Sequence, residues 1–250
     1  MNKLDFNDKQ ILIAGAAIGI GKTTSILISK LGGRVVLLDN NENALKEAFS
    51  CLDGDKHRSF HYDLNDLNGI ECLMKEIVDI CGPFDGLVHC AAIRCRRPLK
   101  MLTPKHLSKV MILNFSSFIE LIRCITKKGN FSNVMSIVGI SSISAQRGGP
   151  GVTAYAASKA AMDAAVRCLA KELAPKSIRL NTVVPAQINT PAYNELIKMK
   201  GNAEDFTLAR QYLGLGEPID VANVITFLLS ENSKLITGSA IPVDGGYLSS

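Results

Sequence analysis

The chain has 250 residues, of which 47% are hydrophobic and 20% are charged, and its formal net charge is +5. That length is ample for a full hydrophobic core, and the composition is that of an ordinary globular protein. The mild positive charge comes without a long basic run, which excludes a nucleic-acid arm and a polybasic membrane patch, and no apolar run approaches the roughly 20 residues of a membrane span.

The 7 cysteines are an odd number and contain no CxxC pair. A disulfide framework or a zinc site has a different pattern, so we expect reduced thiols, no metal site and a cytoplasmic location. The polar first stretch, MNKLDFNDKQ, is unlike a signal peptide.

Short apolar runs alternate along the chain with longer stretches whose apolar residues are spaced three and four apart, such as Leu73, Ile77 and Ile80. Continuous apolar runs are typical of strands buried on both faces, and their alternation with helices predicts a parallel sheet. The expected strands are Gln10–Ala14, Arg34–Asp39, Ser59–Tyr62, Gly86–Cys90, Asn133–Ile140, Arg179–Val184 and Ser239–Val243.

This pattern predicts an α/β fold, a doubly wound parallel sheet of about seven strands with helices on both faces. No linker or repeat interrupts it, so we expect a single domain over residues 1–250. Residues 186–216 are the least regularly patterned and are expected to form a substrate loop or lid.

The stretch IAGAAIGIGKTT, which follows the first expected strand, has two interpretations. Ala16–Thr23 fits a P-loop if Ala is allowed in place of the usual Gly. Alternatively, Gly15 forms a turn, and Gly19 and Gly21 let the backbone approach the pyrophosphate of a dinucleotide. Both interpretations place backbone N–H groups at a helix N-terminus facing an anion, so the stretch alone leaves them open.

Asp39 ends the second expected strand, 18 residues beyond Gly21. A dinucleotide site predicts an acid there to accept hydrogen bonds from the adenosine ribose, whereas a P-loop would use the acid for Mg²⁺. A carboxylate favours free ribose hydroxyls, and Asn40 and Asn41 offer no positive charge to a 2′-phosphate. We therefore expect NAD rather than NADP as the cofactor.

Ser142, Tyr155 and Lys159 form a second constellation, in the segment ISSISAQRGGPGVTAYAASKAAM. Tyr155 and Lys159 are four residues apart, so they share one face of a helix. A nearby ammonium favours the phenolate, which lowers the phenol pKa from its usual value near 10 and permits proton transfer. A serine hydroxyl can hold the substrate oxygen on which charge develops.

Taken together, these motifs resemble the short-chain dehydrogenase/reductase family over nearly the whole chain. The carrying segments are the glycine turn Gly15–Gly21, Asp63-Leu64, Asn114 in LNFSS, Ser142 with Tyr155 13 residues later, YAASK at Tyr155–Lys159, and the closing segments Ile178–Pro191, Gly216–Ala222 and Ile236–Tyr247. The resemblance favours a Rossmann fold and the dinucleotide interpretation over the P-loop.

The resemblance implies a role for each matched position. Tyr155 would be the general acid/base, Lys159 would lower its pKa and bind the nicotinamide ribose, Ser142 would orient the substrate, and Asn114 would hold a water in a proton relay. The implied cofactor-binding residues are Gly15, Ala17, Ile18, Gly19, Ile20, Asp39, Asp63, Leu64, Cys90, Ala91, Ala92, Tyr155, Lys159, Pro185, Ile188 and Thr190.

Three positions depart from the family pattern. His89-Cys90-Ala91-Ala92 stands where the family has NNAG, Ala186 follows Pro185 where Gly is usual, and Ala14 replaces a Thr that braces the glycine turn. None of them removes a proton-transfer group. A single histidine at a strand end is more often structural than catalytic, so we expect His89 to be structural, and Cys90 and Cys95 to be packing or loop residues.

The expected function is NAD(H)-dependent interconversion of a secondary alcohol and a ketone. One alternative is a 3-oxoacyl-carrier-protein reductase using NAD(P)H, and another is a weakly catalytic dinucleotide-binding sensor. The basic cluster of Arg94, Arg96, Arg97 and Lys100 is expected to be a solvated loop, although in the first alternative its arginines and Lys171 can meet an acidic carrier. The resemblance also implies a homo-oligomer, a tetramer or dimer, and the alanine-rich run from Ala156 to Ala165 permits close helix approach.

Overall fold

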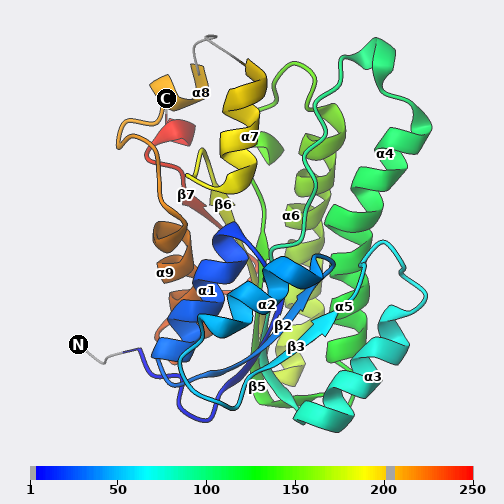
Figure 1. Cartoon of the computed structure of the whole chain (residues 1–250), viewed down its shortest axis with the longest axis vertical. Helices are drawn as coiled ribbons and strands as arrows, with labels where there is room; N and C mark the ends of the chain where they lie inside the picture. Colours follow the sequence, from blue (N-terminus) through cyan, green and yellow to red (C-terminus); the bar gives the residue numbers. More distant parts are fainter. Residues whose placement is uncertain (1–3, 201–205, 250) are drawn as a thin grey trace.

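The sheet has seven parallel strands in the order β3-β2-β1-β4-β5-β6-β7 (Figure 1). The computed structural model describes residues 4–200 and 206–249. The strands are β1 (Gln10–Ala14), β2 (Arg34–Asp39), β3 (Arg58–His61), β4 (Phe84–His89), β5 (Phe131–Ile140), β6 (Ile178–Pro185) and β7 (Ala240–Val243). The predicted doubly wound sheet is thus confirmed, with strand ends that move by at most two residues.

Helices cover both faces of this sheet (Figure 1). They are α1 (Gly19–Lys30), α2 (Glu42–Ser50), α3 (Ile70–Cys81), α4 (Pro104–Met111), α5 (Ser117–Ile125), α6 (Thr153–Leu173), α7 (Pro191–Lys200), α8 (Phe206–Ala209) and α9 (Pro218–Leu229). One core joins the sheet to α1, α2 and α9, and the other joins it to α3, α5 and α6.

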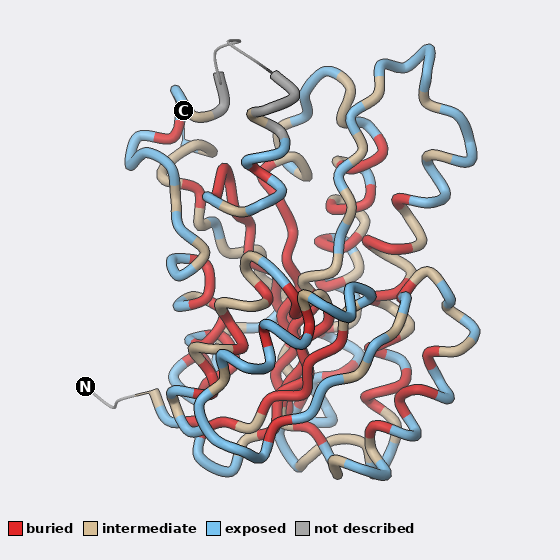
Figure 2. Tube along the Cα trace, in the orientation of Figure 1, coloured by how far each residue is buried: buried red, intermediate tan, exposed pale blue. Residues whose placement is uncertain are grey.

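Strand β1 shows how the sequence produces these two cores. Ile11 and Ile13 pack into the core under α1, whereas Leu12 and Ala14 pack into the core under α5 and α6. Successive side chains of a strand point to opposite faces, so a continuous apolar run is needed where both faces are covered. Figure 2 shows the consequence, a buried trace along the centre of the molecule with exposed helix faces around it.

The strand order reverses between β1 and β4, because β2 follows on one side of β1 and β5 lies beyond β4. In open parallel sheets, ligands bind outside the carboxyl ends of the strands at such a reversal. The glycine turn begins directly after β1, and Cys90 comes directly after β4. The topology therefore places the glycine turn at the carboxyl ends of the strands where such sheets bind ligands.

The segment expected to be a loop or lid, 186–216, contains helices α7 and α8. Its ends are tied together, since the Gln187 backbone N–H donates to Gln211 Oε1 at 3.0 Å and Ile188 forms a parallel bridge with Gly216. Residues 201–205 of that expected lid lie outside the described residues. Among the helices that the structure describes, none combines the length and the apolar character needed to cross a membrane.

Candidate active site

The glycine turn after β1 is pressed against the turn after β4. The backbone N–H groups of Cys90 and Ala91 donate to the carbonyl oxygen of Ala14 at 2.7 and 3.1 Å. Gly15 has a φ of +78°, and a Cβ on it would lie 2.8 Å from the carbonyl carbon of Cys90. Glycine is needed here for the left-handed backbone and for the close approach of the two chains.

Helix α1 begins at the end of this turn without a side-chain cap. Gly19 has a φ of +55°, and its missing Cβ would lie 3.3 Å from Cγ2 of Thr190, which follows β6. The uncapped first turn leaves backbone N–H groups available to an anion. Gly21 has a different reason to be glycine than expected, because a Cβ there would clash with the Gly15 carbonyl group rather than with a ligand.

Asp39 contacts the glycine turn from the end of β2. Its Oδ2 accepts a hydrogen bond from the Ala17 backbone N–H, and its Oδ1 accepts one from the Asn41 N–H, both at 3.0 Å. The carboxylate therefore braces a turn in which Ala14 offers no hydroxyl. The two residues expected on the adenine side follow β3, the strand that pairs with β2. Asp63 accepts two hydrogen bonds from Asn65, and Leu64 is buried in the core.

Asn114 lies in a π-helical turn, Ile112–Ser116, between α4 and α5, and is fully buried. Its Oδ1 accepts from the Ile93 N–H at 2.8 Å, and its Nδ2 donates to the Ile93 carbonyl and to Ser158 Oγ, both at 3.0 Å. Such π turns are frequent at functional sites. Asn114 thus holds the segment after β4 against α6, a role for its side chain that sequence reasoning missed.

Tyr155 and Lys159 lie on α6 at the carboxyl ends of β5 and β6, and both are buried. The Lys159 Nζ donates to the Ile140 carbonyl oxygen at 2.6 Å and lies 5.9 Å from the centroid of the Tyr155 ring. Ser142, two residues beyond β5, faces the same phenol. The structure therefore brings together three of the four expected catalytic side chains, and Asn114 contacts Ser158 directly before Lys159.

Two cations act on the Tyr155 phenol. Burial raises its pKa, but the charges of Lys159 and Arg94, together with hydrogen bonds from Ser142 and Arg94, outweigh burial and leave the pKa below its ordinary value. Burial also lowers the pKa of Lys159. Arg94 is exposed, as predicted for the basic loop, and its guanidinium carbon lies 5.9 Å from the Tyr155 ring centroid.

Known proteins resemble this chain in fold and in sequence. A solved structure of a short-chain dehydrogenase/reductase, glucose/ribitol dehydrogenase, from Brucella melitensis superposes with a TM-score of 0.90 at 29% identity, covering 98% of this chain and 99% of that one. The 3-oxoacyl-[acyl-carrier-protein] reductase FabG of Thermotoga maritima is 34% identical, covering 96% of this chain and 98% of the relative. Residues 15–248 match a family model described as enoyl-(acyl carrier protein) reductase. The chain belongs to the short-chain dehydrogenase/reductase family.

Membership makes this short-chain dehydrogenase/reductase an oxidoreductase with a nicotinamide dinucleotide as its cofactor class. The relatives differ in the substrates that their names state. An L-xylulose reductase of Caenorhabditis elegans is 32% identical over 97% of this chain and 97% of the relative, and a cyclopentanol dehydrogenase of Comamonas testosteroni is 30% identical over 96% and 97%. Relatives with similar sequence identity to this chain are thus named for three different substrates: a carrier-bound acyl group, a sugar and a cyclic alcohol.

His89, at the first position where this short-chain dehydrogenase/reductase departs from NNAG, is fully buried. Its Nε2 lies 3.0 Å from Ser117 Oγ, which itself donates to the Leu113 carbonyl, so Nε2 carries the proton and Ser117 accepts. Burial, followed by the charge of Lys159, lowers the His89 pKa to about 3. His89 is therefore neutral. Burial raises the pKa of the adjacent Cys90 thiol to about 12, so Cys90 stays protonated.

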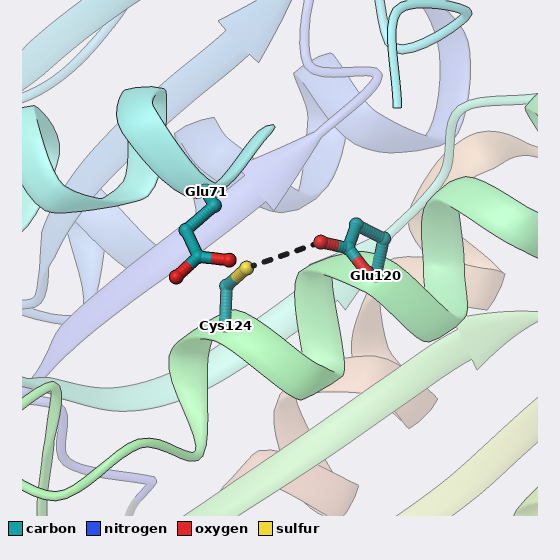
Figure 3. Close-up of side chains that lie close together, drawn as sticks. All are labelled: Glu71, Glu120 and Cys124. Carbon is teal, nitrogen blue, oxygen red and sulfur yellow. Dashed lines mark hydrogen bonds between the residues drawn. The ribbon is translucent and has the colours of Figure 1, made fainter. Parts of the chain in front are cut away.

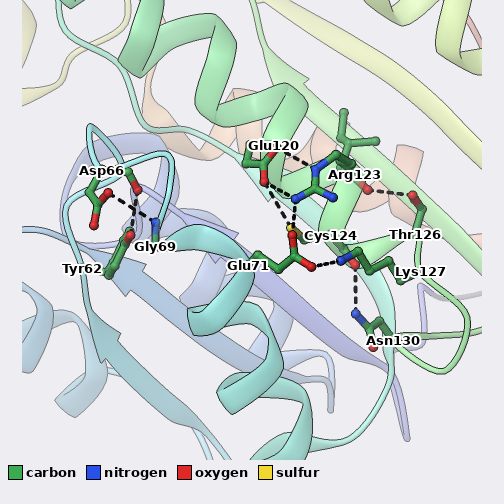
Figure 4. Close-up of polar contacts among 11 residues, drawn as sticks. Tyr62, Asp66, Gly69, Glu71, Glu120, Arg123, Cys124, Thr126, Lys127 and Asn130 are labelled. Atoms are coloured by element: carbon green, nitrogen blue, oxygen red, sulfur yellow. Dashed lines mark hydrogen bonds and ion pairs between the residues drawn. The ribbon is translucent and has the colours of Figure 1, made fainter.

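At the other end of α5 from Asn114, Glu71, Glu120 and Cys124 bring potential metal-ligand atoms within 4.8 Å of one another (Figure 3). Both carboxylates already form ion pairs with basic side chains (Figure 4). Glu71 pairs with Arg123 at 2.5 Å and with Lys127, and Glu120 pairs with Arg123 at 2.6 Å. Burial raises the pKa of the Cys124 thiol to about 11. The cluster is an ion-pair network between α3 and α5.

Proposed function

We propose that the protein interconverts a secondary alcohol and a ketone with NAD(H), and that Tyr155 is its acid/base. The observation that carries the proposal is the position of Tyr155 one turn from Lys159 on α6, with the Lys159 Nζ 5.9 Å from the ring centroid and the pKa of the buried phenol lowered by the charges of Lys159 and Arg94. A phenol with a lowered pKa can take the hydroxyl proton of an alcohol and return it to a ketone. Ser142 would donate to the substrate oxygen and hold it against Tyr155.

The residues around the glycine turn fit a dinucleotide. The uncapped N-terminus of α1, with Gly15, Ala17, Ile18, Gly19 and Ile20 before and in its first turn, would bind the pyrophosphate. When bound, the cofactor supplies or accepts a hydride at nicotinamide C4. On the adenosine side we propose Asp39, Asp63, Leu64, Cys90, Ala91 and Ala92, and on the nicotinamide side Lys159, Pro185, Ile188 and Thr190.

Lys159 would act in two ways. Its ammonium is held by the Ile140 carbonyl oxygen, which leaves further N–H donors for a ribose hydroxyl. Its charge favours the Tyr155 phenolate, and protons would pass from Tyr155 toward water through this group. Asn114 would support the relay by positioning α6 through Ser158, because its amide group is already bonded to Ile93 and Ser158.

We propose NAD rather than NADP because Asp39 stands at the end of β2, beside the glycine turn. Its carboxylate oxygens can accept from the two ribose hydroxyls, and its charge would repel a 2′-phosphate. The two residues that follow are the uncharged Asn40 and Asn41. The 3-oxoacyl-carrier-protein reductase alternative is supported by the name of the Thermotoga maritima relative and would call for NADPH in that subgroup.

We further propose that a second copy of the chain packs against α5 and α6, as a dimer or within a tetramer. A cavity of about 450 Å³ opens between these helices and is lined mainly by apolar side chains, among them Phe115, Ile119, Ala165 and Leu169. Ala165→Arg would place a charge in this surface. Light scattering should then show a smaller assembly than for the unaltered protein, and an unchanged mass would contradict the proposed interface.

The cytoplasm is the compartment we propose. All 7 cysteines are free thiols. Free thiols persist in a reducing compartment, whereas oxidising compartments favour disulfides.

The deciding experiment uses Tyr155→Phe, which removes the phenol oxygen and keeps the ring. The unaltered protein should oxidise NADH in the presence of at least one member of a ketone panel that includes an acyl thioester. The variant should lose about 10²- to 10⁴-fold in kcat while binding NADH nearly as well, since the phenol carries the proton transfer and the other residues proposed to bind the cofactor are unchanged. NADH binding without turnover of any ketone by the unaltered protein would favour the sensor, and substantial turnover by Tyr155→Phe would overturn the role of Tyr155.

A further inference from the structure

Arg94 places a second cation at the proposed acid/base. Its guanidinium carbon is 5.9 Å from the centroid of the Tyr155 ring, and its charge lowers the pKa of the same phenol. Unlike Lys159, which is buried, Arg94 is exposed. It therefore stands on the solvent side of Tyr155, where a ligand can reach its guanidinium.

The loop that carries Arg94 is anchored on both sides. On one side, both backbone groups of Ile93 are bonded to the Asn114 side chain, at 2.8 and 3.0 Å. On the other, the Arg97 N–H donates to the Gly151 carbonyl at 2.7 Å, just before α6. These two anchors fix the backbone on either side of Arg94, so its guanidinium stays within reach of Tyr155.

No carboxylate neutralises Arg94 among the described residues, since none of their ion pairs includes it. The charges that act on Tyr155 are those of Lys159 and Arg94, both positive. The carboxylate whose charge acts on Lys159 is that of Asp163, whose oxygens already accept from Ser141 and Thr182. A guanidinium has five N–H donors in a planar fork that matches a carboxylate, and contact with one phenol ring leaves most of them unused.

We infer that the substrate is a small hydroxy- or oxo-carboxylate, with its carboxylate one or two carbons from the reacting carbon, and that Arg94 binds this carboxylate. The inference rests on the proposed function and narrows its substrate class. In the oxidation, the carbinol carbon gives a hydride to nicotinamide C4 and the hydroxyl proton goes to the Tyr155 phenolate. A hydroxy acid and NAD⁺ thus become an oxo acid, NADH and one proton. The short spacing follows because Arg94 and the substrate oxygen share the same phenol.

The test compares acids with neutral partners of the same carbon skeleton. The probes are 2-oxobutanoate and 3-oxobutanoate, each beside its methyl ester, reduced with NADH by the unaltered protein, Arg94→Met, Arg94→Lys and Arg58→Met. Arg58, an exposed arginine on the edge strand β3, is the matched control. The unaltered protein should prefer an acid over its ester. Arg94→Met should lose about 10- to 100-fold in kcat/KM for the acid, the range expected for a charge-assisted pair, and far less for the ester.

The remaining variants separate binding from an effect on Tyr155. Arg94→Lys should recover part of the preference for the acid, and Arg58→Met should leave it unchanged. If Arg94→Met lowers kcat/KM equally for acid and ester, Arg94 acts only on Tyr155 and the inference is overturned. Preference of the unaltered protein for the ester, or for an acyl thioester, also overturns it.

Failure of the proposed function would look different, because no ketone, acid or ester would then be reduced. Calorimetry of 2-oxobutanoate and 3-oxobutanoate with the protein–NADH complex decides the inference in that case. At least one of them should bind more weakly to Arg94→Met than to the unaltered protein, by about tenfold or more. Equal binding to both would overturn the assignment of Arg94.

Discussion

The Lys159 ammonium is fixed by the Ile140 carbonyl oxygen, 2.6 Å away at the end of β5. Lys159 is buried, yet its nearest partner is a backbone oxygen and not a carboxylate. A carboxylate in that place would neutralise the charge, whereas a carbonyl group holds the ammonium in position and leaves its field to act on Tyr155. The carboxyl end of β5 thereby sets the distance between the Lys159 ammonium and the Tyr155 phenol.

Lys159→Met should shift the pH dependence of alcohol oxidation toward higher pH. Oxidation needs the Tyr155 phenolate, and Lys159 is the largest of the charges that lower the Tyr155 pKa. Without that charge the phenolate is less stable, so the rate should rise at a more alkaline pH. At neutral pH we expect kcat to fall by about 10²-fold or more. The measurement is kcat against pH, with Lys176→Met, an exposed change beyond α6, as control; an unshifted profile would contradict the role of Lys159.

The fold and part of the site were predictable because their signals are local. An apolar run such as VVLL in β2 reports burial on both faces within six residues, and the spacing of Tyr155 and Lys159 places them together on any helix. The position of Gly15 after β1 likewise follows from the chain order. Each of these features can be predicted from residues close together in the sequence, without knowing which distant residues they contact.

The contacts that were missed join segments far apart in the chain. Asn114 binds Ile93 and Ser158 across 21 and 44 residues, and nothing in LNFSS states that pairing. Arg94 belongs to a basic run that a solvated loop explains equally well. Its distance from Tyr155 is set by the anchors at Ile93 and Arg97, which exist only after the sheet has formed. One signal was present: Arg94 lies five residues beyond β4, whose carboxyl end faces the crevice.

Asp39→Ala should weaken the preference for NAD over NADP. The change removes the proposed acceptor for the ribose hydroxyls and the negative charge that would repel a 2′-phosphate. We expect KM for NAD to rise by about tenfold or more and KM for NADP to fall. The ratio of kcat/KM for the two cofactors is the measurement, and Asn40→Ala, the next residue and exposed, is the control. A ratio equal to that of the unaltered protein would remove Asp39 from the ribose.

Gly15→Ala should impair both folding and cofactor binding. A Cβ at this φ of +78° would strain the backbone and push against Cys90 and Ala91, which we expect to cost about 2–4 kcal/mol. In a chain of this size that corresponds to a fall in Tm of roughly 5–15 °C. Gly148→Ala is the matched control, because a Cβ there meets nothing within 4 Å. The Tm and the NADH affinity of both variants are measured by thermal melts and NADH titrations. Equal values for Gly15→Ala and Gly148→Ala would disprove the tight contact at Gly15.

His89 should make the protein less stable as the pH falls below neutrality. Burial lowers its pKa from 6.5 to about 3, so the folded state holds it neutral where the unfolded state binds a proton. The contribution of neutral His89 to the free energy of unfolding is fully present above pH 6.5. It declines as the pH falls toward 3, by up to about 1.4 kcal/mol per pH unit. Urea unfolding of the unaltered protein and of His89→Asn at several pH values measures it. The stability of His89→Asn should fall less steeply, while His61→Asn, an exposed change on β3, should behave as the unaltered protein does. Parallel curves for His89→Asn and the unaltered protein would mean that the pKa of His89 is the same in the folded and unfolded states.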